Sequence, residues 1–135
     1  MTNSKEFVLK GVLLTDTPTK TGRIYPHAVM EKALREYKAK YVDKRLALGE
    51  LRDGNGAHTT ATVNLDKVSH EITDVSLDET GVNCTVRVLD TPVGKRALEC
   101  ALPITVDIRA LACVKDWIVQ DDLEILSFDL VNPNE

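Results

Sequence analysis

The sequence has 135 residues and a mass of 14.9 kDa; 43% of its residues are hydrophobic, 28% are charged, and the net charge is −4. This length and composition predict one domain, residues 1–135, with a buried core. No apolar run is long enough to cross a membrane, and the N-terminus lacks a signal-peptide pattern, so we expect a protein kept in a cytoplasm. An acidic chain without a basic cluster disfavours nucleic acid as a partner.

The three cysteines, Cys84, Cys100 and Cys113, are far apart and odd in number. No pair has the C-x-x-C spacing of a zinc site, and no disulfide framework is indicated. We expect all three to be small buried hydrophobic residues, with a crosslink between subunits as the alternative. Aromatic residues make up only 4%, which disfavours stacking on bases. The sequence therefore predicts no metal and no cofactor.

The N-terminal third predicts a strand, a helix and a second strand. Residues 6–14 form a mostly apolar run, and turn-forming residues follow it. Pro26 is suited to the first turn of a helix, because it has no N–H to leave unpaired. An apolar stripe at helical spacing then predicts a helix over residues 26–41. A short strand is expected at residues 46–51, before a loop with two glycines.

The middle of the chain predicts strands that each have one buried face. Residues 60–65 alternate between apolar and polar, and so do residues 68–77. The second series changes phase near residues 73–74, which indicates a β-bulge. Residues 78–81 have the composition of a hairpin turn, and residues 82–88 alternate directly after it.

The last third predicts a short helix and two further strands. Thr91 and Pro92 provide a cap and a first-turn proline for the helix. Residues 104–110 alternate as a strand, which residues 112–114 are expected to extend. A turn-like break follows at residues 116–117, and residues 123–131 form the last strand. Six or seven strands joined mostly by short turns, with two flanking helices, indicate an antiparallel barrel-like core in the mainly β or α+β class.

Five stretches resemble motifs of the prohead maturation proteases of tailed phages, and they occur in that family's order. The fold of those proteases is akin to the herpesvirus assemblin protease. Each motif is short, but together they cover nearly the whole chain. They are Gly-Arg-Ile-Tyr-Pro at 22–26, Leu-Gly-Glu-Leu at 48–51, Val-Ser-His at 68–70, Leu-Asp-Thr-Pro-Val-Gly-Lys at 89–95 and Phe-Asp-Leu-Val-Asn-Pro at 128–133.

The chain departs from the family pattern at both catalytic positions. The resemblance implies a histidine base where Asp53 stands and a serine nucleophile where Asp107 stands. A carboxylate at the nucleophile position opposes the negative charge of the tetrahedral intermediate, so the sequence predicts a protein that does not cut. Arg109 matches the family arginine, and we expect it to pair with Asp107 in a structural role worth about 0–1 kcal/mol if exposed.

Catalysis by residues other than those at the two family positions is a weaker alternative, and the sequence offers three candidate sites for it. In the first, His58 swings in from its glycine-containing loop as a base, although we expect it to be solvated. His70 is expected to be a hydrogen-bonded core residue. Ser69 and His70 are neighbours on a strand and should face opposite sides, so they are not expected to pair. In the last alternative, Asp53 and Asp107 face each other and share a proton or hold a hard cation.

The resemblance implies a phage capsid context. A compact acidic chain that begins at its first strand and ends at its last suggests a decoration, or cement, protein of the virion. Its expected partner is the major capsid protein, on whose lattice it would sit as a homo-oligomer. An active maturation protease with atypical catalytic residues is one alternative, and an internal scaffold or assembly protein is another.

Overall fold

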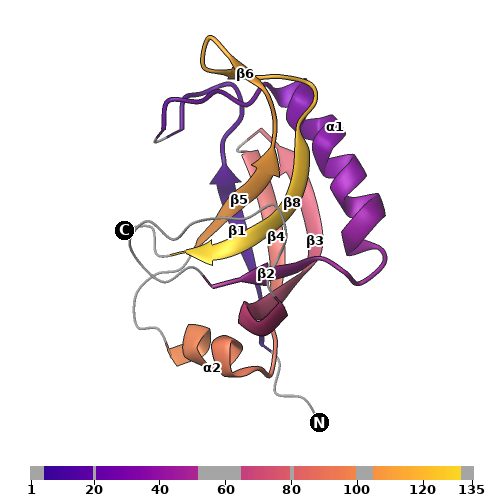
Figure 1. Ribbon diagram of the computed structural model, residues 1–135, viewed down its shortest axis with the longest axis vertical. Coiled ribbons are helices and arrows are strands. Elements are labelled where there is room, and N and C mark those ends of the chain that lie inside the picture. Colours follow the sequence, from indigo (N-terminus) through magenta and orange to yellow (C-terminus); the bar gives the residue numbers. More distant parts are fainter. Residues whose placement is uncertain (1–4, 20, 52–64, 80, 100–104, 132–135) are drawn as a thin grey trace.

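The computed structural model describes residues 5–19, 21–51, 65–79, 81–99 and 105–131. Two α-helices accompany eight strands in this part of the chain, and four of the strands form the largest sheet (Figure 1). The elements in chain order are β1 (Lys5–Leu13), α1 (His27–Tyr37), a π-helical turn (Lys38–Val42), β2 (Leu48–Glu50), a 3-10 turn (Leu65–Lys67), β3 (Val68–Asp78), β4 (Gly81–Val88), α2 (Pro92–Glu99), β5 (Thr105–Leu111), β6 (Val114–Lys115), β7 (Ile118–Val119) and β8 (Glu124–Val131).

The strands form three antiparallel sheets. The largest has the order β1-β4-β3-β2, and β5–β8 and β6–β7 form separate pairs. A parallel bridge between Leu51 and Leu130 joins β2 to β8. The mainly β class with two helices is confirmed. The barrel is not, because the described strands do not close into a single hydrogen-bonded ring.

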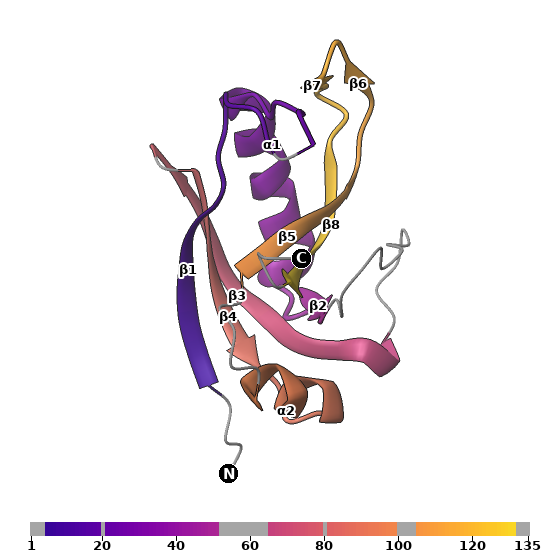
Figure 2. The same ribbon diagram turned by 90° about the vertical axis from the view of Figure 1, so that its left-hand side faces the viewer.

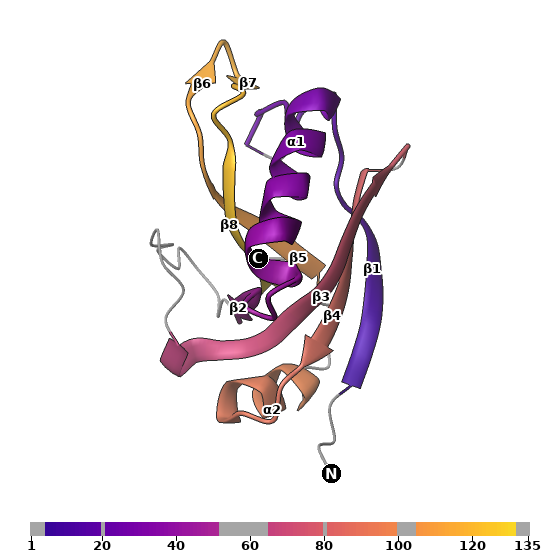
Figure 3. The ribbon, with the colours of Figure 1, turned by 90° about the vertical axis from the view of Figure 1, so that its right-hand side faces the viewer.

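The core lies between the four-stranded sheet and the β5–β8 pair, and α1 packs into this space (Figures 2 and 3). The buried face of α1 carries Met30, Leu34 and Tyr37. The ring of Tyr37 meets Phe128 of β8 edge-on at 5.3 Å between centroids. The apolar stripe predicted from the sequence is therefore the face of α1 that packs into the core. The α-helix itself ends at Tyr37, and a π-helical turn follows it to Val42.

Two irregularities in the sheet bear on the site. The register of β3 against β4 shifts between Ile72 and Asp74, which confirms the predicted bulge. The predicted β3–β4 hairpin is also confirmed, and Gly81 at its turn has a φ of +114°. A second register shift was not predicted. Gly49 pairs with His70 while Glu50 pairs with Val68, so Ser69 is an extra residue in β3.

Several predicted boundaries change. Strand β5 ends at Leu111, and residues 112–113 do not extend it; the short β6–β7 hairpin follows instead, with the predicted turn at residues 116–117. Residues 60–64 lie outside the described residues, and Leu65 begins a 3-10 turn. Cys84 is buried as predicted, Cys113 is exposed, and Cys100 is outside the described residues. None of the helices found in the described ranges has the length and apolarity needed to cross a membrane.

Candidate functional site

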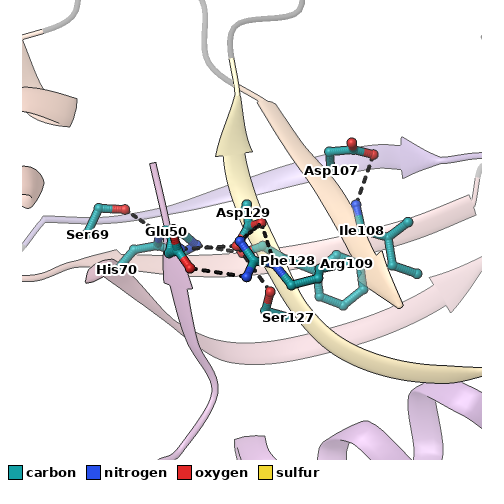
Figure 4. Close-up of polar contacts among 9 residues, drawn as sticks. All are labelled: Glu50, Ser69, His70, Asp107, Ile108, Arg109, Ser127, Phe128 and Asp129. Carbon is teal, nitrogen blue, oxygen red and sulfur yellow. Dashed lines mark hydrogen bonds and ion pairs between the residues drawn. The ribbon is translucent and has the colours of Figure 1, made fainter. Parts of the chain in front are cut away.

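Polar side chains from three strands meet in a buried cluster where β2 approaches β5 and β8 (Figure 4). At its centre is the guanidinium of Arg109, whose side chain is only 4% exposed. Its Nε and Nη2 donate to Asp129 Oδ2 at 3.0 and 2.9 Å, and its Nη1 lies 3.1 Å from Glu50 Oε2. One cation thus compensates two carboxylates that burial would otherwise make costly.

The strand register explains why these residues meet. Arg109 of β5 pairs with Ser127 of β8, and Asp129 lies two residues further along the same face. Ser127 Oγ donates to Asp129 Oδ1 at 3.1 Å, and the backbone N–H of Glu50 donates to the same oxygen, also at 3.1 Å. The Asp129 carboxylate therefore ties β2 to both strands of the β5–β8 pair.

His70 forms a second link between the sheet and β8. Its Nε2 lies 2.7 Å from the carbonyl oxygen of Phe128, and the ring is completely buried. A carbonyl oxygen only accepts, so Nε2 carries the proton. The bond passes directly over Gly49, where a Cβ would lie 2.5 Å from that carbonyl oxygen and still nearer the imidazole Nε2. His70 is thus the hydrogen-bonded core histidine that the sequence predicts.

Ser69 and His70 do pair, and the prediction that they cannot is wrong. Ser69 Oγ lies 2.7 Å from His70 Nδ1. Since Nε2 donates to Phe128, Nδ1 of the neutral ring accepts from the serine hydroxyl. The physical reason is the β3 bulge: the extra residue at Ser69 breaks the alternation of faces and brings two successive side chains together. Both residues are 0% exposed, so this serine and histidine have no surface to offer a peptide.

The burial of His70 predicts a pH-dependent stability. Burial lowers its pKa, against the smaller opposing effects of the Phe128 carbonyl and the Asp129 carboxylate. The unfolded chain takes up a proton at an ordinary pKa of about 6.5, and the folded chain does so only at lower pH. The free energy of unfolding should therefore fall as the pH drops from 7.5 through 6.5 towards 5. Urea unfolding at a series of pH values measures this slope.

His27 provides the control for that experiment, because it is exposed on α1. His27→Asn should retain the slope between pH 7.5 and 5, and His70→Asn should flatten it. Glu71 does not interfere in this window. Arg45 and Arg87 lower its pKa in spite of burial, so its contribution is lost only below about pH 4.5. An unchanged slope in His70→Asn would assign the effect to another group.

The residues chosen from the sequence are only partly brought together. Asp107 is exposed on β5, and its Oδ1 accepts the backbone N–H of Ile108 at 3.0 Å (Figure 4). Arg109 was expected to pair with Asp107, but its described ion pairs go to Asp129 and Glu50, because a buried guanidinium needs buried carboxylates. Asp53 lies outside the described residues.

The other rearranged sites stay predictions. His58, like Asp53, lies outside the described residues, so neither its solvation nor an Asp53–Asp107 carboxylate pair is tested. Within the part of the chain that the structure describes, His, Cys, Asp and Glu side chains form no group of three that could hold a metal ion.

Sequence reasoning missed Asp129, Glu50 and Ser127 as members of the cluster. The signal for Asp129 was present, because it stands in the otherwise largely apolar strand β8. A carboxylate in such a strand requires a buried cation, and Arg109 is a cation in a strand of similar character. A carboxylate among the apolar residues of one strand and a cation in another strand of similar character predict a pairing.

The comparisons with known proteins agree with this fold. The family model of the prohead core protein serine protease matches residues 4–119. Among solved structures, the bacteriophage T4 capsid assembly protease, gp21, is 24% identical with a TM-score of 0.79, over 96% of this chain and 81% of that one. That likeness concerns the fold. No curated protein matches. Since the family model covers most of the sequence, this chain belongs to the prohead core protein serine protease family.

Proposed function

We propose that this chain is a family member that does not cut peptide bonds and serves as a structural protein of a phage capsid, a decoration protein on the outer lattice. The observation that carries the proposal is Asp107. By the motif resemblance this residue stands at the nucleophile position, and its exposed carboxylate accepts a hydrogen bond from its own strand. Peptide hydrolysis by a serine protease needs a hydroxyl there and donors for an oxyanion.

The buried cluster supports the same reading. Arg109 matches the family arginine by the same resemblance, and in this chain its guanidinium is engaged by Asp129 and Glu50 away from solvent. These contacts stabilise the strands whether or not chemistry takes place beside them. Retention of Arg109 is therefore compatible with loss of cleavage.

A capsid context follows from the family and from the T4 protein, which is named a capsid assembly protease. The partner we propose is the major capsid protein, with this chain bound as a homo-oligomer. The acidic net charge and several exposed hydrophobic side chains suit a protein that works by binding surfaces.

The test is incubation of the purified protein with its capsid and scaffold proteins, followed by analysis for cleavage. We expect no cleavage by the parent chain and none by Asp107→Ala. Cleavage that Asp107→Ala abolishes would overturn the proposal. The decoration role has its own measurement: mature particles should contain the protein in lattice stoichiometry. Presence in proheads and loss from finished heads would instead identify an internal scaffold.

The hydrogen bond between Ser69 and His70 favours one alternative, an active protease with atypical catalytic residues. We expect this pair to be structural, because both side chains are fully buried. Ser69→Ala should therefore leave the cleavage assay unchanged from the parent. A fluorophosphonate probe should fail to label the parent chain in the native state. Labelling that disappears in Ser69→Ala would establish the enzymatic alternative.

A further inference from the structure

The β6–β7 hairpin lies at one end of the molecule (Figures 1 and 2), and exposed apolar residues occur in and beside it. Eight large hydrophobic residues of the described chain are exposed, and four of them fall within residues 111–118. Trp117 at the tip is 65% exposed. The gathering of exposed apolar residues in this short segment marks the hairpin as a candidate contact element. Val114 shares a face of the hairpin with its buried partner Val119, whereas Ile118 lies on the other face beside Lys115. We call Trp117 and Ile118, at the tip and just after it, the hairpin patch.

The backbone at the tip is unfavourable for the residues that occupy it. Asp116 and Trp117 form the two-residue turn, with φ values of 52° and 68°. Such turns favour Asn and Gly, and a tryptophan in this conformation is strained. A hydrogen bond stabilises this backbone conformation, because the Trp117 carbonyl accepts the N–H of Ile24 at 2.8 Å. A strained position that presents a large aromatic side chain to solvent is typical of a binding anchor.

Acidic residues are frequent in the segment that contains the hairpin patch. Residues 114–124 contain four carboxylates and one lysine. Asp121 and Glu124 are exposed, and so is Asp122, whose carboxylate accepts the N–H of Cys113. A partner surface should therefore combine an apolar contact with basic side chains.

The end of α1 has those properties in the same chain. Residues 38–46 contain four cations and one carboxylate. Lys38 and Arg45 pair with acids of β3, while Lys40 and Lys44 are exposed. Leu46 is 59% exposed, and Arg45 has a φ of 60°, a second strained residue beside an exposed apolar one. This basic segment lies at the end of α1 remote from the hairpin (Figure 3).

We propose that the hairpin patch of one copy docks on the basic segment, residues 38–46, of a second copy. Trp117 packs against Leu46, and Asp121 and Glu124 face Lys40 and Lys44. The two surfaces differ and lie apart on the chain, so the contact is head-to-tail and builds a ring or a chain of copies. The inference concerns contacts between copies and does not depend on whether the protein cuts or on what the assembly binds.

Two measurements on the purified full chain test for the contact. Sedimentation velocity should show a sedimentation coefficient that rises with protein concentration, and less so at high salt. Trp117 is the sole tryptophan of the sequence, so its fluorescence reports on the patch directly. Its emission should shift to the blue as the copies associate. A monomer at every concentration would overturn the proposal.

The first variant is Trp117→Gly, which suits the positive φ and removes the anchor. It should remain folded and lose association by at least about tenfold. Lys40→Glu with Lys44→Glu should weaken association to a similar degree. The matched control is Lys10→Glu with Lys67→Glu, two exposed lysines outside both surfaces, which makes the same change in net charge. If the two charge reversals weakened association equally, net charge alone would explain the effect. That result would overturn the assignment of the contact to residues 38–46.

A charge exchange then identifies the partner surfaces. Asp121→Lys with Glu124→Lys should also fail to associate, since the hairpin then repels the basic segment. Mixing this variant with the Lys40→Glu and Lys44→Glu variant should restore assembly, because each hairpin then meets a segment of opposite charge. Failure of the mixture to assemble while the parent does would place the contact elsewhere.

Discussion

Asp129→Ala is expected to lower the free energy of unfolding by about 3–5 kcal/mol. The substitution removes the carboxylate that accepts from the Nε and Nη2 of Arg109 and leaves that guanidinium buried with weaker compensation. It also leaves the Ser127 hydroxyl and the Glu50 N–H without the acceptor they share. Urea unfolding monitored by circular dichroism measures the loss.

The same substitution on the neighbouring strand is the matched control. Asp107 is the direct cross-strand partner of Asp129, but it is exposed. Asp107→Ala should change the stability by no more than about 0.5 kcal/mol. Two aspartates in one register pair should thus differ several-fold in their contribution. Equal effects would show that the buried cluster does not carry the stability we assign to it.

Gly49→Ala should cost about 3 kcal/mol. A methyl group at this position would overlap the His70 imidazole and the Phe128 carbonyl oxygen, so the hydrogen bond between β3 and β8 has to open. Thermal or urea unfolding gives the magnitude. The heteronuclear NMR spectrum of the variant should show the largest changes at His70 and in β8.

A double-mutant cycle checks the cause. On the Gly49→Ala background, replacing His70 by alanine should cost much less than it does in the parent chain, because the clash is relieved and the bond is already broken. Additive losses would mean that the alanine acts through the backbone conformation of β2 rather than through the imidazole.

Local patterns were sufficient to predict many elements of this fold. The phase change in residues 68–77 gave the bulge near Asp74, and the turn composition before Gly81 gave the β3–β4 hairpin. Both features are set by neighbouring residues, so a pattern of period two contains them. The closure of a barrel is not local. It depends on hydrogen bonds between strands distant in sequence, and here the described strands form separate sheets.

The site was less predictable for a similar reason. The alternation rule placed Ser69 and His70 on opposite faces, and it failed because the pairing of β3 with β2 inserts an extra residue. That bulge is set by Gly49 and Glu50 across the sheet, and nothing in the Val-Ser-His stretch encodes it. Likewise the ion pairs that the structure describes for Arg109 join it to β2 and β8, whose residues lie far from it in sequence, whereas the sequence suggested only its neighbour Asp107.

The position of Arg109 bears on how sequences of this family are to be compared. A lineage that has given up cleavage is free to change residues that contacted only the substrate. It is not free to replace a guanidinium that compensates the buried carboxylates of Asp129 and Glu50. Persistence of this arginine in an alignment would mark descent and a folded domain. If the proposal for Asp107 holds, the residues at positions 53 and 107 would be the ones to compare between peptidases and relatives without cleavage.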